Sequence, residues 1–115
     1  MAPTTEDMAK TVAGLVKAGF RVSLERDNKT RGDVTVYERL RWTLTRAKSV
    51  QLELEALDYP DGTAAFYLQV TDYHGLSTPS FPLDSWKLWP ARIEFKFYTH
   101  PESGQGLTFT LDLEA

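Results

Sequence analysis

The 115-residue sequence contains no cysteine. This absence excludes disulfides, thiolate nucleophiles and cysteine-ligated metal sites. Long apolar runs are also missing, and none approaches the roughly 20 residues that a membrane-spanning helix needs. The first ten residues, MAPTTEDMAK, lack the basic start and apolar run of a secretory signal. We therefore expect a soluble, cytoplasmic protein that does not associate with membranes.

Motifs that identify a reaction are equally scarce. No glycine-rich phosphate-binding loop precedes a predicted helix, and His74 and His100 have no partners at metal-binding spacing. Asp72, His74, Ser77 and Ser85 contain the chemical groups of a hydrolytic triad, but they share one segment that has no nucleophile elbow. We predict a non-enzymatic protein with no catalytic residues, no cofactor and no bound metal.

The composition is that of a globular chain, with 42% hydrophobic and 25% charged residues, and its length suits a single domain over residues 1–115. Charge is distributed unevenly. Residues 1–48 carry ten Lys and Arg against six Asp and Glu, whereas residues 49–115 carry three against ten. A basic half can indicate a nucleic-acid surface. It can also arise when strands of opposite charge pair with one another.

Residues 4–19 predict an N-terminal helix. Thr4 stands three residues before Asp7, the spacing at which both side chains cap the free N–H groups of a first turn. Gly19 suits the left-handed position after a helix, with Phe20 as the apolar residue that folds back on it. One apolar face recurs at helical spacing: Met8, Val12, Leu15 and Val16.

From Phe20 onward the apolar period changes to two, which predicts strands. Each strand has one apolar face, so antiparallel pairing over a single buried side is expected. The fold class is therefore α+β, with a single N-terminal helix packed on a curved antiparallel β-meander of about six strands. This outline resembles the cystatin-like and helix-grip groups of folds, but an outline alone assigns no function. The predicted strands are 20–25, 34–44, 50–54, 66–70, 93–97 and 107–113.

Turn chemistry predicts the register of the central strands. In YPDGT, Pro60 suits a type I turn and Gly62 the left-handed position that follows, so residues 60–62 form the loop. A second three-residue loop, 46–48, matches apolar with apolar and basic with acidic residues. The predicted pairs are Leu54 with Leu68, Leu52 with Val70, Trp42 with Leu52, Leu40 with Leu54, Arg41 with Glu53 and Arg39 with Glu55. The basic half is thereby interpreted as largely self-paired.

Glu38 is a charged residue at a position where the alternation of residues 34–44 calls for an apolar side chain. It stands between Val36 and Leu40, and the predicted register places it opposite Ala56. A carboxylate on a core face is unfavourable unless it is paired or neutralised. We interpret it as a bulge or sheet corner that turns Glu38 to water. The alternative is a carboxylate at the mouth of a cavity.

The segment DYHGLSTPSFPLDSWKLWPA, residues 72–91, holds three prolines and two of the three tryptophans. We predict that it is irregular, with a helical turn at LDSWKL. In one interpretation Phe81, Leu83, Trp86 and Trp89 plug an open end of the core. In the other, exposed aromatic side chains anchor a partner protein, since tryptophan and tyrosine dominate binding hot spots.

The leading hypothesis is a non-enzymatic protein–protein interaction module, such as an accessory, inhibitor or immunity-type protein. Its predicted partner-binding residues are Tyr73, His74, Phe81, Trp86 and Trp89. The alternative is a pocket for an apolar ligand, lined by Glu38, Trp42 and Trp86. Less expected is single-stranded nucleic-acid binding through Tyr37, Tyr67, Tyr73, Arg39 and Arg41. Sheet-edge strands also offer a route to a homodimer.

Overall fold

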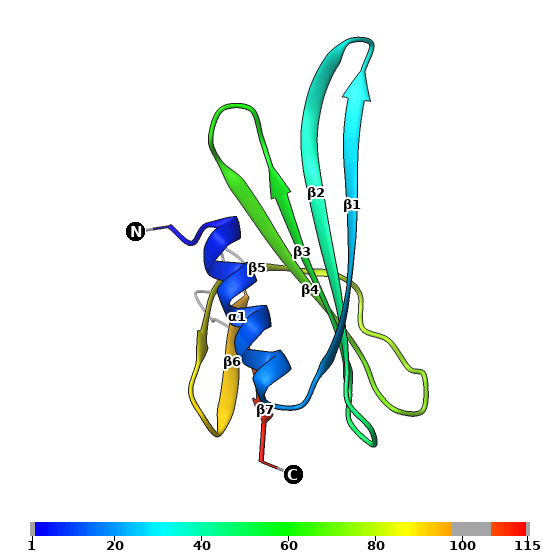
Figure 1. The fold of residues 1–115 in the computed structure, drawn as a ribbon, viewed down its shortest axis with the longest axis vertical. Coiled ribbons are helices and arrows are strands. Elements are labelled where there is room, and N and C mark those ends of the chain that lie inside the picture. Colours follow the sequence, from blue (N-terminus) through cyan, green and yellow to red (C-terminus); the bar gives the residue numbers. More distant parts are fainter. Residues whose placement is uncertain (1, 98–106, 115) are drawn as a thin grey trace.

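The computed structural model describes residues 2–97 and 107–114. One helix is followed by a meander in which every strand lies beside its neighbour in the chain, so the spatial order is that of the sequence (Figure 1). This confirms the α+β class and gives seven strands within the described residues, where the sequence predicted about six. The elements are α1 (Thr5–Lys17), β1 (Arg21–Arg31), β2 (Val34–Thr45), β3 (Gln51–Asp58), β4 (Ala64–Thr71), β5 (Phe81–Leu88), β6 (Arg92–Phe97) and β7 (Thr108–Asp112).

Both ends of α1 have the predicted caps. Thr4 and Asp7 form a reciprocal capping box, and these hydrogen bonds lower the pKa of the Asp7 carboxyl. At the other end Gly19 has a φ of 102°, and the N–H of Phe20 donates to the carbonyl of Leu15 at 3.1 Å. This bond, together with that from Gly19 N–H to Val16, is the Schellman arrangement. The helix therefore ends where the first strand begins.

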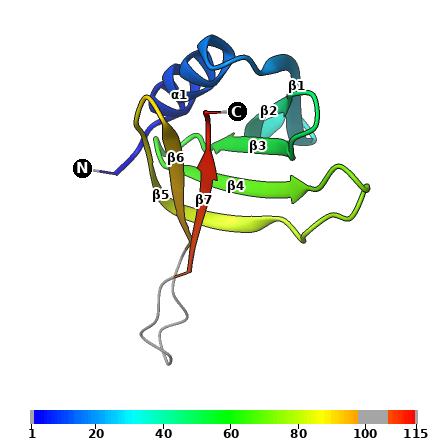
Figure 2. The same ribbon diagram turned by 90° about the horizontal axis from the view of Figure 1, so that it is seen from below.

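The sheet changes direction at β5, whose first two residues pair with β4 and whose later residues pair with β6. Only two residue pairs join β4 and β5, Tyr67 with Pro82 and Leu68 with Phe81, and proline has no N–H to give to a ladder. Beyond this seam β5–β7 turn across the line of β3 and β4, so the sheet curls around α1 (Figures 1 and 2). Gly14 allows α1 to approach β5, because a Cβ added there would collide with the Leu88 side chain.

The core fills the space between α1 and the inner face of the curled sheet. Its buried members come from the helix and from both parts of the sheet. They are Met8, Val12, Leu15, Phe20, Trp42, Leu44, Leu52, Leu54, Ala56, Phe66, Leu68, Leu83, Ile93, Phe95 and Leu113. Thr11 is a buried polar residue, and its hydroxyl donates to the carbonyl of Asp7 and accepts from the indole of Trp86.

The β3–β4 register is as predicted, but the β2–β3 register is shifted by two residues. Trp42 lies opposite Leu54 rather than Leu52, and Leu40 lies opposite Ala56 rather than Leu54. The connection spans 46–50, with Lys48 in the left-handed conformation at a φ of 57°. Because side chains alternate with period two, a two-residue shift keeps every residue on its predicted face. Apolar matching therefore could not detect the error.

The first strand is longer than predicted. Residues 26–31 were assigned to a polar loop, yet they continue β1 and pair with β2 up to a turn at Gly32 and Asp33. This end of the β1–β2 hairpin projects past α1 (Figure 1). With no helix to bury one face there, the strand has no need of alternating apolar residues, and the sequence signal of a strand is lost.

The prediction that residues 72–91 lack a regular strand is also wrong. Residues 81–88 form β5, and LDSWKL is extended rather than a helical turn. A register shift between Leu83 and Ser85 separates the inward-facing Leu83 and Trp86 by three positions. This bulge breaks the two-residue period by which the other strands were recognised.

Candidate functional site

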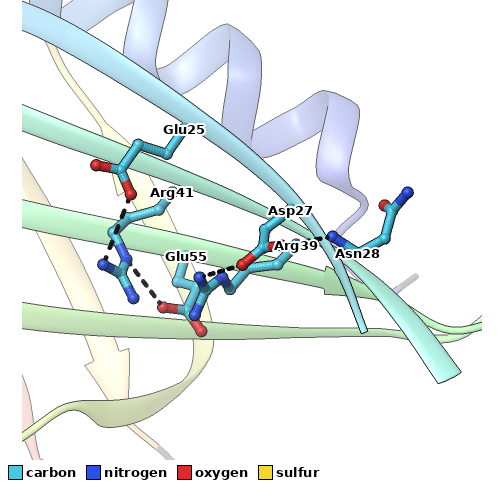
Figure 3. A network of polar contacts seen from close by, with 6 residues as sticks. All are labelled: Glu25, Asp27, Asn28, Arg39, Arg41 and Glu55. Carbon is cyan, nitrogen blue, oxygen red and sulfur yellow. Dashed lines mark hydrogen bonds and ion pairs between the residues drawn. The ribbon is translucent and has the colours of Figure 1, made fainter. Parts of the chain in front are cut away.

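The outer face of the sheet carries a ladder of ion pairs across three strands (Figure 3). Arg41 on β2 lies between Glu25 of β1, at 3.8 Å, and Glu55 of β3, at 3.5 Å. Arg39 pairs with Asp27 of β1 at 2.7 Å. The predicted partners, Glu53 for Arg41 and Glu55 for Arg39, are wrong by the same two-residue shift.

This ladder neutralises the two arginines expected to contact phosphates in a nucleic-acid complex. Tyr67, on the same face, is half-buried, and burial together with nearby Tyr59 and Glu55 raises the pKa of its phenol. Arg39 and Arg41 would have to exchange carboxylate partners for phosphates. The outer face is therefore a poor electrostatic platform for nucleic acid.

The β1 edge, residues Arg21–Arg31, is the most open surface of the sheet. All eleven of its residues are exposed, and one side of the strand has no neighbour in the sheet. Val22 and Leu24 point to the apolar inner face yet remain 43% and 44% exposed. Val16, 41% exposed, stands two residues and so about half a turn from Gly14, on the helix side away from β5. Val22 and Leu24 thus form an apolar strip on the unpaired strand.

The charges of the β1 edge are unbalanced. Its two carboxylates, Glu25 and Asp27, are held by arginines of β2. Within residues 2–97 and 107–114, its four cations form no ion pair; these are Arg21, Arg26, Lys29 and Arg31. The edge therefore has free backbone donors and acceptors and an excess of positive charge, of which Arg26 shares a hollow with the carboxylates of Glu38 and Asp58.

A hollow of about 680 Å³ lies on the inner side of the projecting hairpin. Glu38 lines it, is exposed, and stands opposite Asp58 rather than Ala56. The interpretation as a sheet corner turned to water therefore fits. Trp42, the other predicted pocket residue, does not line this hollow, because it is 5% exposed in the core. The hollow is polar, with Arg26, Asn28 and Asp58 among its lining residues.

Replacing Glu38 by glutamine should change the free energy of unfolding by less than about 1 kcal/mol. The side chain is exposed, and the residue opposite it, Asp58, is also a carboxylate. The negative charge of Glu38 therefore does not stabilise this pair. Urea titration followed by tryptophan fluorescence measures the difference. A loss of several kcal/mol would mean that the Glu38 carboxylate has a buried partner.

The first part of segment 72–91 forms a capped turn. The carboxylate of Asp72 accepts from the backbone N–H groups of His74 and Leu76, and Gly75 has a φ of 88°. Tyr73 is 73% exposed and its ring lies 4.0 Å from that of His74. In the described part of the chain, no hydrogen bond joins the His74 imidazole to Asp72, Ser77 or Ser85. These residues are not arranged as a triad.

The remaining predicted partner-binding residues lie apart from this turn. Phe81 begins β5, is 37% exposed and contacts Phe97 at 5.4 Å between ring centres. Trp86 is half-buried on the inner face, and half-buried Trp89, beyond the far end of β5, lies between Lys87 and Arg92. Trp89 is eight positions beyond Phe81 along extended chain, a distance of about 25 Å. The five predicted residues therefore do not gather into one patch.

Residues 2–97 and 107–114 contain no group of three or more His, Asp or Glu side chains placed to hold a metal ion. No helix in these ranges has the length and apolar character to cross a bilayer. His100 lies outside the described residues. Comparisons with protein-family models, curated proteins and solved structures gave no match.

Proposed function

We propose that the protein is a non-enzymatic interaction module that binds an extended segment of a partner protein along the β1 edge. The observation that carries the proposal is the exposure of all eleven residues of β1, including its inward-facing Val22 and Leu24. An added strand would satisfy the free backbone groups of the edge, and its side chains would cover the apolar strip. Binding by β-augmentation needs no pocket and no catalytic group.

The turn at residues 73–76 is a less suitable surface. Tyr73 and Leu76 are both 73% exposed, but Asp72 and the Thr71–Ser77 bridge already occupy the surrounding backbone groups. The turn offers side chains without an unpaired strand. It therefore provides a matched control for the β1 edge.

Replacing Leu24 by lysine should weaken partner capture at least about tenfold, because an added strand would then have to cover a charged side chain in place of an apolar one. Leu24 is 44% exposed, so the free energy of unfolding should fall by no more than about 1 kcal/mol. Affinity capture from native lysate, with bound proteins quantified by mass spectrometry, compares the variant with the wild type. Circular dichroism verifies the fold.

Leu76→Lys is the matched control, since it adds the same charge at another exposed leucine. Capture should survive this change. If instead Leu76→Lys or Trp89→Ala abolishes capture and Leu24→Lys does not, the binding surface lies along residues 72–91 and the β1 edge is not the site.

A further inference from the structure

We infer that the segment bound by the β1 edge is acidic and belongs to a different protein. This inference rests on the proposed function and specifies the chemistry of the partner. Glu25 and Asp27 already neutralise arginines on β2, so the edge strand presents four cations and no free carboxylate in the described part of the chain. A neighbouring strand places its side chains about 5 Å from those of the edge, within reach of all four.

The position of each cation defines the pattern of the ligand. Arg26 lies on the inner face of β1, after Val22 and Leu24. The other three cations, Arg21, Lys29 and Arg31, lie on its outer face. A complementary antiparallel strand would carry an acidic residue opposite each cation and an apolar residue opposite Val22 and Leu24. Read from its N-terminus, such a strand has three acidic residues opposite the cations at 31, 29 and 26. Two apolar residues follow, opposite Leu24 and Val22, and then one acidic residue opposite Arg21.

A second copy of β1 matches this edge less completely. Two copies of β1 could pair antiparallel across a two-fold axis and form one continuous sheet. The axis must then pass through a residue, because only this register puts the inner faces of both copies on the same side. Axes through Glu25, Arg26 or Asp27 place like charges opposite each other. An axis through Ser23 matches Arg21 with Glu25 but covers only residues 21–25. It leaves the remaining cations without a partner.

An axis through Leu24 matches Arg21 with Asp27 and Leu24 with itself. It sets Arg26 opposite Val22, however, and leaves Lys29 and Arg31 without a partner.

An axis through Asn28 is the third complementary case for self-pairing. It matches Glu25 with Arg31 and Asp27 with Lys29, but both carboxylates already hold arginines of β2. It also leaves Val22 and Leu24 uncovered. None of the three arrangements covers the apolar strip and pairs all four cations, whereas an acidic segment of another protein does.

The test uses the synthetic peptide ETETSETVTVE, designed to pair antiparallel with Arg31 to Arg21. Its glutamates lie opposite the four cations and its valines opposite Val22 and Leu24. Fluorescence anisotropy of the labelled peptide should show saturable binding to the wild-type protein, weakening as salt is raised. The peptide KTKTSKTVTVK, with lysine in place of each glutamate, should bind at least about tenfold more weakly.

Charge reversal on the protein provides the reciprocal test. The double variant Lys29→Glu with Arg31→Glu should bind the acidic peptide at least about tenfold more weakly. The control double variant, Lys48→Glu with Lys96→Glu, makes the same change in net charge away from β1 and should bind like the wild type. Leu24→Lys should also weaken peptide binding, because the valine opposite residue 24 would then cover a charged side chain in place of an apolar one.

Each other outcome overturns the inference in a distinguishable way. If neither peptide binds at millimolar concentration, or both bind equally, the acidic preference is wrong, while loss of lysate capture by Leu24→Lys still supports the proposed function. If sedimentation shows a dimer that Leu24→Lys dissociates, the occupant is a second copy. If a single-stranded oligonucleotide binds and the acidic peptide does not, the four cations serve phosphates instead.

Discussion

Replacing Trp86 by alanine should lower the free energy of unfolding by about 3 kcal/mol, toward the lower end of what loss of a core aromatic costs. The indole is half-buried, and it meets the ring of Phe66 edge-on with 5.0 Å between centroids. Its Nε1–H donates to the hydroxyl of Thr11 at 2.9 Å, which ties β5 to α1. Chemical denaturation measures the loss, with circular dichroism as the signal because a fluorophore is removed.

Two variants separate packing from hydrogen bonding at this position. Trp86→Phe retains a ring against Phe66 and loses the bond to Thr11, so it should cost about 1 kcal/mol plus a smaller packing loss. Trp89→Ala should cost less than Trp86→Ala, because Trp89 lies beyond β5 between two cationic side chains. A Trp86→Ala protein as stable as the wild type would contradict a supporting role for Trp86. It would instead favour the partner-anchor interpretation of that residue.

Replacing Arg46 by alanine should lower the free energy of unfolding by about 2 kcal/mol, the scale of a charged group losing its carbonyl partners. Its guanidinium donates to the carbonyl of Leu113 at 2.9 Å and to that of Ala18 at 3.4 Å. It also lies over the ring of Phe20, 4.7 Å from the centroid. One side chain thereby joins the end of α1 to the chain beyond β7.

Arg46→Lys is the informative companion to this variant. In the guanidinium fork Nη1 donates to the carbonyl of Leu113 and Nη2 to that of Asp112, at 3.4 Å. Lysine keeps the charge and most of the aliphatic stem but has one nitrogen in place of this planar pair. We expect it to recover less than half of the loss, as measured by urea unfolding. Full recovery by lysine would show that charge and stem suffice, and the bidentate geometry would then have no energetic role.

Local rules predicted those parts of the fold whose signals are local. The capping box at Thr4, the Schellman turn at Gly19 and the YPDGT loop each depend on a few adjacent residues, and each is present as predicted. The β2–β3 shift depends instead on loop length. It leaves the apolar and acidic patterns almost unchanged, so pattern matching accepted the wrong register. In β5 a single bulge was enough to conceal a strand.

The candidate site was less accessible to sequence reasoning. Aromatic density drew attention to residues 72–91, but Trp86 supports the core, and the other side chains are divided between the turn at residues 73–76 and the two ends of β5. The β1 edge lacks aromatic residues and was in part assigned to a loop. Its signal in the sequence is the position of β1 as the first strand of a meander, since such a strand has a neighbour on one side only. The sequence does not show which charges of β1 are paired. In the structure Glu25 and Asp27 pair with arginines of β2, which leaves the four cations of β1 without a carboxylate on their own strand.

The strand order has a consequence for how the chain folds. Each hairpin closes a short stretch of chain, so the ladder from β1 to β7 can assemble stepwise from local contacts. The contacts between Trp86 and Thr11, and between Arg46 and Leu113, instead join residues 75 and 67 positions apart. Their entropy of closure is greater, which favours their formation after the hairpins. Contacts that form late should slow unfolding more than they speed folding.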